Sequence, residues 1–369
     1  MAEPLVTRRA TWPVPTFLPD ATRAGVRATS AVDLRGIGIE GLVVNAFHLL
    51  RRPGARVVQA AGGVHRFMGW DGPILSDSGG FQVWSLIRQD PARGVIRDNE
   101  VIFREPTTGQ KWNLTPERVI RLQMQLGSDV LVCLDDCTDA GDPEPEQERS
   151  VARTVKWARR CRDEFDRQTD RLPAGGRPLL FAVVQGGGSE ALRRQCATEL
   201  SNIGFDGYGF GGWPLGEDGA LLAEPLRWVA ETLPEAAAKH ALGIGRPDHV
   251  VAAHALDYSI FDCALPTRDA RHGRLYAFRA GWGSRRPSSG DPFYAALRMH
   301  DAKYRIDHGP LEDGCDCPFC GAGLSRAYLH HLFKVGDVAA ERYATLHNLR
   351  FYVRLFELLR GGALDTSPV

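Results

Sequence analysis

Short apolar runs alternate with longer segments of helical periodicity along most of the chain. Helix-start signals lie between the runs, at Thr115 before Pro116, at Ser189 and at Pro247. Strands that alternate with helices predict an α/β fold, a (β/α)8 TIM barrel, whose reactive side chains come from the C-terminal ends of the strands. The eight predicted strands are residues 16–18, 42–46, 74–77, 130–135, 179–185, 207–211, 241–244 and 259–262.

The segment 87–113 is too long and too rich in strand-forming residues for an ordinary connection. Val101, Phe103 and a Thr107-Thr108-Gly109 turn predict a β-hairpin inserted between a barrel strand and the helix at Thr115. The whole chain of 369 residues can hold a barrel and a small appendage. We therefore predict a catalytic barrel over residues 1–305 and a C-terminal helical subdomain over residues 306–369.

Composition describes a globular protein and excludes the membrane class. The chain is 43% hydrophobic and 24% charged, with a formal net charge of zero. No apolar segment reaches spanning length, and residues 1–15 do not resemble a secretory signal, so we expect a cytoplasmic protein. A nucleic-acid partner would have to meet a local basic patch, because the chain as a whole is not basic.

Asp77 stands where a predicted strand opens onto a Ser-Gly-Gly turn. The carboxylate would face a substrate there, Phe81 would offer a flat surface to a base, and Gln82 would offer a donor and an acceptor. The alternative is that Asp77 caps a helix starting near Phe81 and that Phe81 belongs to the core.

Polar residues also stand at the ends of other predicted strands. Two carboxylates that flank a glycosidic bond can act as nucleophile and as general acid and base, and Asp77 and Asp262 suit these roles. Asp135 and Gln185 could bind the edge of a purine, and glycines at other strand ends leave room for a flat heterocycle. Alternatively, each Asp satisfies loop backbone or pairs with an Arg.

The chain becomes basic between residues 268 and 305, with nine Lys or Arg against three Asp. Arg268 and Arg271 follow Asp262 closely, so they could hold phosphates of a polynucleotide while Asp262 acts on one nucleoside. A solvated charged face is the alternative. The aromatic residues interleaved with these charges are Tyr276, Phe278, Trp282, Phe293 and Tyr294.

Three cysteines crowd together near the C-terminus as Cys315, Cys317 and Cys320. With His347, on a predicted helix over residues 337–359, they would complete a closed Cys3His shell for one structural Zn²⁺. His330 and His331 compete with His347 for the fourth position.

With these motifs in place, the chain closely resembles the tRNA-guanine transglycosylases from residue 15 to about residue 352. Several separate motifs in the right order are more specific than any one alone. The matching segments are Asn45-Ala46-Phe47-His48-Leu49, Asp77-Ser78-Gly79-Gly80-Phe81-Gln82, Val184-Gln185-Gly186-Gly187, Phe261-Asp262-Cys263, Pro266-Thr267-Arg268 and Ser325-Arg326-Ala327-Tyr328-Leu329-His330-His331.

The resemblance implies a zinc-bearing barrel that exchanges guanine at the wobble position of tRNA for a 7-deazaguanine, in queuosine biosynthesis. It implies that Asp262 forms a covalent bond to ribose, that Asp77 manages protons, and that Arg268 and Arg271 contact the anticodon loop. It also implies a homodimer with Tyr328 and His331 near the interface. The residues implied to bind the base are Phe81, Asp135, Cys137, Gln185, Gly212, Trp213, Leu242 and Gly243.

The chain departs from the family pattern where the 7-substituent of the base is expected. Gly211-Gly212-Trp213-Pro214-Leu215 stands in place of the usual Gly-Gly-Leu-Ala-Val, and the added bulk leaves the incoming base open between 7-aminomethyl-7-deazaguanine, queuine and another deazaguanine. A DNA substrate also stays open. Rival interpretations are a barrel glycosidase, which needs no cysteine cluster, and a non-catalytic RNA-binding subunit, which needs neither Asp77 nor Asp262.

Overall fold

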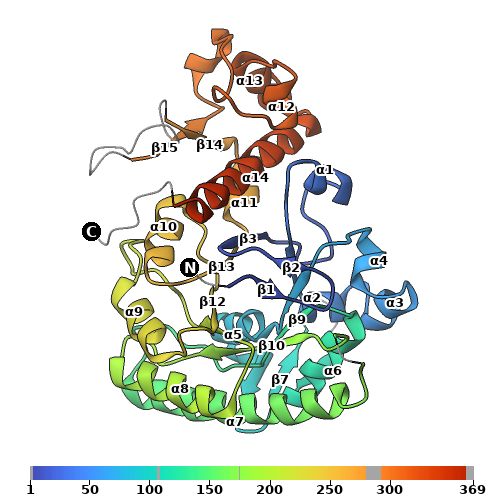
Figure 1. The fold of residues 1–369 in the computed structure, drawn as a ribbon, viewed down its shortest axis with the longest axis vertical. Helices are drawn as coiled ribbons and strands as arrows, with labels where there is room; N and C mark the ends of the chain where they lie inside the picture. Colours follow the sequence, from blue (N-terminus) through green and yellow to red (C-terminus); the bar gives the residue numbers. More distant parts are fainter. Residues whose placement is uncertain (1–2, 106–108, 174, 280–291, 363–369) are drawn as a thin grey trace.

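Eight parallel strands form the centre of the molecule (Figure 1). The computed structural model describes residues 3–105, 109–173, 175–279 and 292–362. In chain order the barrel strands are β3 (Thr16–Pro19), β4 (Leu42–Asn45), β5 (Ile74–Asp77), β9 (Val130–Val132), β10 (Leu179–Val184), β11 (Gly207–Phe210), β12 (Ala238–Ala241) and β13 (Ile260–Cys263).

The barrel closes between its first two strands. The strand order is β3-β13-β12-β11-β10-β9-β5-β4, and a parallel bridge between Asp20 and Val43 joins the two ends. The predicted (β/α)8 barrel is therefore confirmed. The predicted seventh strand was placed three residues too late, because Gly243 has a φ of +74° and belongs to the turn after β12.

Helices surround the strands (Figure 1). As predicted, Thr115 caps α6 and Ser189 caps α8, each with a side chain that accepts a backbone N–H, and Pro247 starts α10. The helices of this layer are α1 (Ala31–Gly36), α2 (Ala46–Arg51), α3 (Ala55–Ala60), α4 (Val64–Met68), α5 (Gly80–Gln89), α6 (Pro116–Leu126), α7 (Glu144–Thr169), α8 (Glu190–Ile203), α9 (Ala223–Thr232), α10 (Pro247–Ala255) and α11 (Leu265–Arg271).

A short hairpin covers the N-terminal end of the barrel. Strands β1 (Leu5–Val6) and β2 (Thr11–Trp12) pair with each other, and Trp12 packs with the inward-facing residues of the barrel. Arg8 binds Asp129 just before β9. The interior is a filled apolar core that includes Leu18, Val43, Leu75, Val130, Phe181, Val183 and Ile260. The N-terminal end of the barrel is therefore covered and its interior filled by side chains.

The segment inserted after α5 contains the predicted β-hairpin within a three-stranded antiparallel sheet. A third strand, β6 (Gly94–Ile96), pairs with β7 (Val101–Arg104) after the short helix η1 (Pro91–Arg93), and β8 (Lys111–Leu114) completes the sheet. Val101, Phe103 and Leu114 are buried against the barrel helices. Thr107 and Thr108 of the predicted turn lie outside the described residues.

The C-terminal region packs on one side of the barrel (Figure 1). The basic stretch forms the antiparallel pair β14 (Arg274–Phe278) and β15 (Tyr294–Arg298), with Trp282 outside the described residues. η2 (Ala302–Ile306), α12 (Pro318–Gly321) and α13 (Arg326–Val335) follow. The long α14 (Val338–Arg360) packs against β3 and α11 through residues such as Tyr352 and Phe356. The domain division at residue 305 stays a prediction.

No helix in the described part of the chain is both long enough and apolar enough to cross a membrane.

Candidate active site

One cavity of about 540 Å³ opens at the C-terminal ends of the barrel strands. Both Asp77 of β5 and Asp262 of β13 line it, and in the closed barrel β3 and β4 lie between these two strands. The other predicted site residues in its wall are Phe81, Asp135, Cys137, Gly212, Trp213, Leu242, Gly243 and Arg268. The structure thus places two carboxylates, aromatic rings and exposed backbone around a space large enough for a nucleoside.

Asp77 ends β5 and is held by the neighbouring strand. The side chain of Asn45, at the end of β4, donates from Nδ2 to Oδ2 of Asp77 at 2.6 Å and to Oε1 of Gln82 at 2.8 Å. Burial, and after it the charge of Asp262, raises the pKa of Asp77 to about 6. A carboxyl with this pKa can both hold and release a proton near neutral pH.

The alternative roles for this segment are wrong. Helix α5 has Gly79 as its N-cap and no side-chain cap, so Asp77 does not cap it. The Phe81 side chain is 36% exposed and does not belong to the core.

Asp262 lies on β13 and is bound through one oxygen. His240 Nε2 lies 2.8 Å from Oδ1 of Asp262, and the backbone N–H of Gly243 donates to the same oxygen at 3.3 Å. His240, like Asn45, was not predicted as a site residue. A correct β12 register would have placed its side chain inside the barrel.

Asp135 and Gln185 form a pair at the ends of β9 and β10. Gln185 Nε2 donates to Oδ2 of Asp135 at 2.7 Å, while burial raises the pKa of Asp135 to about 7. Gln185 is fully buried behind Asp135, and its Oε1 has no hydrogen-bond partner among the described residues. Asp136 turns away from the cavity and pairs with Arg153 of α7.

Two aromatic rings stand at the cavity wall. The rings of Phe81 and Trp213 are nearly parallel, at 18°, with their centroids 6.5 Å apart, and Trp213 is 51% exposed. Rings presented in this way can stack on a heterocycle. The predicted Cys137 and Leu242 add apolar surface to the same wall.

A buried arginine, also not predicted, fixes the loops that hold the base-binding candidates. The Arg193 guanidinium donates to the carbonyls of Val184 and Gly211 at 2.7 and 2.9 Å, and it lies over the Phe210 ring. Burial lowers the pKa of Arg193 to about 10, so it stays charged at neutral pH. Arg193 thus ties the ends of β10 and β11 together behind Gly212.

The two predicted polynucleotide contacts lie on α11, directly after β13. Arg268 lines the cavity, whereas Arg271 lies outside its wall and donates to the Thr267 carbonyl. Neither arginine forms an ion pair with a carboxylate in the part of the chain that the structure describes. Both charges are therefore available to an anionic partner.

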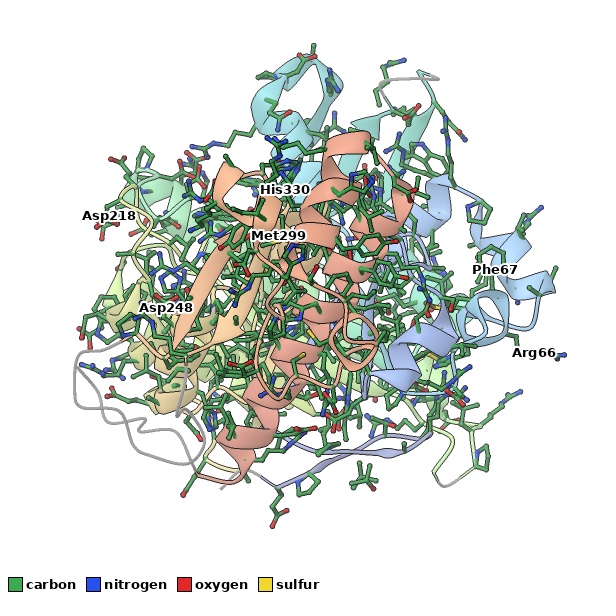
Figure 2. The ribbon with its side chains drawn as sticks, turned by 90° about the horizontal axis from the view of Figure 1, so that it is seen from above. Arg66, Phe67, Asp218, Asp248, Met299 and His330 are labelled. Atoms are coloured by element: carbon green, nitrogen blue, oxygen red, sulfur yellow. The ribbon has the colours of Figure 1, made fainter. Side chains whose placement is uncertain are left out.

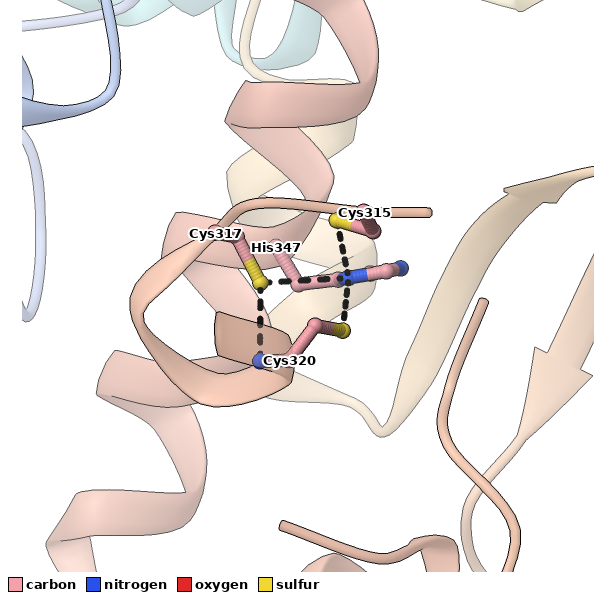
Figure 3. Close-up of side chains that lie close together, drawn as sticks. All are labelled: Cys315, Cys317, Cys320 and His347. Carbon is pink, nitrogen blue, oxygen red and sulfur yellow. Dashed lines mark hydrogen bonds between the residues drawn. The ribbon is translucent and has the colours of Figure 1, made fainter. Parts of the chain in front are cut away.

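A second cluster, formed by Cys315, Cys317, Cys320 and His347, could hold a metal ion (Figure 3). Nδ1 of His347 lies 3.7, 3.5 and 3.6 Å from the three sulfurs, in chain order. Tetrahedral zinc, with Zn–S about 2.3 Å and Zn–N about 2.0 Å, requires an S···N separation of roughly 3.6 Å. The four predicted ligands are brought together, and their spacing fits this ion.

Hydrogen bonds behind the cluster select His347 as its fourth member. His347 Nε2 lies 2.8 Å from the Tyr276 carbonyl oxygen, which leaves Nδ1 for the metal. Its neighbour Asn348 accepts from the Tyr276 N–H and donates to the carbonyls of Pro266 and Arg274. The competitor His330 instead contacts the Met299 carbonyl through Nδ1, at 2.6 Å (Figure 2).

Comparison with known proteins gives one consistent result. A family model described as Queuine tRNA-ribosyltransferase matches residues 3–363. A queuine tRNA-ribosyltransferase of Thiobacillus denitrificans is 39% identical over 353 residues, which cover 96% of this chain and 88% of that protein. The corresponding protein of Nitrosospira multiformis is 40% identical over 353 residues, covering 94% of this chain and 87% of its own length.

Proposed function

This chain belongs to the queuine tRNA-ribosyltransferase family, and we propose that it is a pentosyltransferase that exchanges guanine in tRNA for a 7-deazaguanine. The observation that carries this proposal is that Asp77 and Asp262 line one cavity at the barrel mouth. A glycosidase would share this pair, but it has no use for the metal cluster. A non-catalytic RNA-binding subunit has no use for the pair itself.

The two carboxylates divide the reaction between them. Asp262 attacks the anomeric carbon of ribose, the bond from this carbon to the base nitrogen breaks, and Asp77 gives its proton to the departing guanine. The incoming base then returns a proton to Asp77 and displaces Asp262 from the same carbon. Two displacements retain the configuration, and the ester to Asp262 conserves the bond energy, so no ATP is required.

The base is held by the wall opposite the sugar. Asp135 binds its polar edge, and Gln185, which lies behind Asp135, holds this carboxylate through Nε2. The unpaired Oε1 of Gln185 supports a role in base binding, because a buried acceptor without a partner is costly. Backbone at Gly212 and Gly243 approaches the ring closely, Phe81 and Trp213 stack on it, and Cys137 and Leu242 complete the pocket. The incoming base is 7-aminomethyl-7-deazaguanine or queuine, and Trp213 borders the space for its 7-substituent.

Arg268 and Arg271 bind phosphates of the anticodon loop next to the target nucleoside, at its wobble position. The Cys3His cluster holds a structural Zn²⁺, because four protein ligands leave no open coordination position for substrate. We also assign a cytoplasmic location and a homodimer. The exposure of Tyr328 and Val335 on α13, at 41% and 61%, supports an interface there near His331, which a mass measurement in solution would detect.

The proposed chemistry is tested by trapping the covalent intermediate. Wild-type protein incubated with unmodified tRNA is expected to give a protein–tRNA adduct that survives denaturation, whereas Asp262→Asn is expected to give none. The adduct should disappear when a 7-deazaguanine is added, and candidate bases compared in this chase identify the preferred one. Tight tRNA binding without an adduct in either protein would favour the non-catalytic RNA-binding subunit, and an adduct formed with DNA in place of tRNA would identify a different substrate.

A further inference from the structure

His240 is a buried histidine in direct contact with Asp262. It lies on β12 opposite Ile260 of β13, and Asp262 comes two residues after Ile260. Side chains alternate along a strand, so His240, Ile260 and Asp262 all point into the barrel. The His240 side chain is 1% exposed and lies below Asp262, on the side away from the cavity mouth.

The contacts of Asp262 distinguish its two oxygens. Oδ1 receives both His240 Nε2, at 2.8 Å, and the Gly243 N–H, at 3.3 Å. Oδ2 has no hydrogen-bond partner among the described residues. The bonds therefore fix the plane of the carboxylate and leave one oxygen unencumbered at the cavity.

The residues beside His240 on the two neighbouring strands are not polar. Its partners across the sheet, Gly209 and Ile260, carry no polar side chain. Two charged groups interact with His240. Asp262 contacts it directly, and Asp77 interacts with it electrostatically. Lys239, next to it on β12, pairs with Asp257. A donor opposite Oδ1 can stabilise a negative charge on Asp262, the carboxylate that the proposed attack requires.

Resting on the base exchange proposed above, we propose that His240 is a positioning residue that donates from Nε2 to Oδ1 of Asp262, stabilises its negative charge and leaves Oδ2 to attack the anomeric carbon. When the carbon–oxygen bond to Oδ2 forms, the electron pair of the broken carbon–nitrogen bond leaves with the base, and Asp77 supplies the proton. In the second displacement, the same Nε2–H stabilises Asp262 as the departing carboxylate. His240 thus assists both steps.

Two substitutions separate this role from a purely structural one. His240→Leu removes the donor, while His240→Gln offers an amide N–H at a similar reach. We expect His240→Leu to slow adduct formation with saturating tRNA by about 100-fold, as for loss of one donor to a developing or reacting charge. His240→Gln should recover part of this loss. tRNA affinity should stay within about 3-fold of wild type, because His240 lies below the nucleoside.

The pH profile supplies a readout that altered packing alone would not move. A negative charge on Asp262 loses its hydrogen-bond donor in His240→Leu, so the acid side of the adduct-formation profile should shift to higher pH in this variant and shift less in His240→Gln. The matched control is His254→Gln, on the outer helix α10, where Nδ1 of His254 lies 3.0 Å from the Tyr258 carbonyl oxygen. It should keep the wild-type rate and profile.

The rate of adduct formation and its pH profile in the His240 variants decide whether His240 has this role. A folded His240→Leu protein that forms the adduct at the wild-type rate with an unshifted profile would overturn the role of His240, while the base exchange itself would stand. If His240→Leu does not fold, a wild-type rate and profile in His240→Gln together with a normal rate in a third variant, His240→Phe, would overturn it equally. If the wild-type protein forms no adduct at all, the proposed function fails, and the role of His240 fails with it.

Discussion

Three of the four aspartates that line the cavity at the barrel mouth, Asp77, Asp135 and Asp262, differ in their surroundings. Asp262 accepts two hydrogen bonds on one oxygen. Asp77 lies half-buried near Asp262, and Asp135 lies half-buried with the Gln185 amide as its side-chain donor. Burial raises the pKa of Asp77 to about 6 and that of Asp135 to about 7. Two of the three carboxyls can therefore hold a proton near neutral pH.

We expect Asp135→Asn to raise the free energy of unfolding at pH 8 and to leave it almost unchanged near pH 4. In the unfolded chain Asp ionises near pH 4, whereas in the folded protein the pKa of Asp135 is about 7. Between these values only the unfolded state gains the ionisation free energy, so wild-type stability falls as pH rises. The shift sets an upper bound of about 4 kcal/mol for the gain. Thermal unfolding across this range measures it.

Asp218→Asn, in an exposed loop, is the matched control and should keep the wild-type dependence of stability on pH. A gain for Asp135→Asn that is equal at pH 4 and pH 8 would contradict the assignment of a buried, protonated carboxyl. The stabilised variant should also bind guanine more weakly, because the amide has lost a carboxylate acceptor for the edge of the base.

At the scale of elements, the apolar runs of the sequence were enough to predict the barrel, because parallel strands covered on both faces are almost continuously apolar. β12 was the exception. Lys239 and His240 interrupt its apolar pattern, so the prediction moved to the apolar residues beyond them and missed His240. The polar side chain of His240 made β12 hard to recognise as a strand, and His240 was missed for this reason.

One small antiparallel sheet was predicted incompletely and another was not predicted, for a different reason. β6 is only three residues long, and β14–β15 lies in a segment where Arg alternates with aromatic residues. Both depend on packing against distant parts of the chain, such as Phe351 of α14 against Phe278, which sequence spacing does not reveal. The four metal-cluster residues were predictable because three of them lie within one short motif.

The C-terminal elements depend on the metal cluster for their core. α12 has four residues and cannot persist alone, so Cys317→Ser should lose the metal and lower the unfolding temperature of α12 and α13. Guanine binding in the cavity should be kept, because no residue of the cavity wall belongs to the cluster. Metal content by elemental analysis and hydrogen exchange of residues 315–335 would measure both effects.

The matched control is Cys161→Ala, since Cys161 is equally buried but lies between α7 and α6, far along the chain from the cluster. It should cost some stability and keep a full complement of metal. Unchanged metal content in Cys317→Ser would refute the ligand assignment.

At the scale of the whole molecule, a chain with a net charge of zero has to attract an RNA of high negative charge. Most arginines of the described surface are paired with carboxylates, as Arg194 is with Glu190 and Glu231. Arg268 and Arg271 are not, and they stand beside the cavity. Local, unpaired charge thus replaces the overall basicity that the composition lacks.

Arg268→Ala should weaken tRNA binding at low salt and flatten its salt dependence. Each phosphate contact that is lost reduces the slope of log K against log salt by about 0.7 for single-stranded RNA, because one counterion fewer is released. Titrations at several salt concentrations measure the slope. Arg194→Ala removes an equal charge from an outer helix and should leave the slope unchanged. Equal effects of the two substitutions would argue against a specific phosphate contact.

The side chain of Asn348 links the metal cluster to the segment that carries Arg268 and Arg271. It bonds to the backbone at both ends of the segment from Pro266 to Arg274, while the adjacent His347 belongs to the metal cluster. Arg268 and Arg271 lie within that segment. We therefore expect scarcity of metal in the cell to appear first as poor capture of substrate at low tRNA abundance, with turnover of captured molecules intact. Turnover that fails before capture in metal-depleted protein would contradict this link.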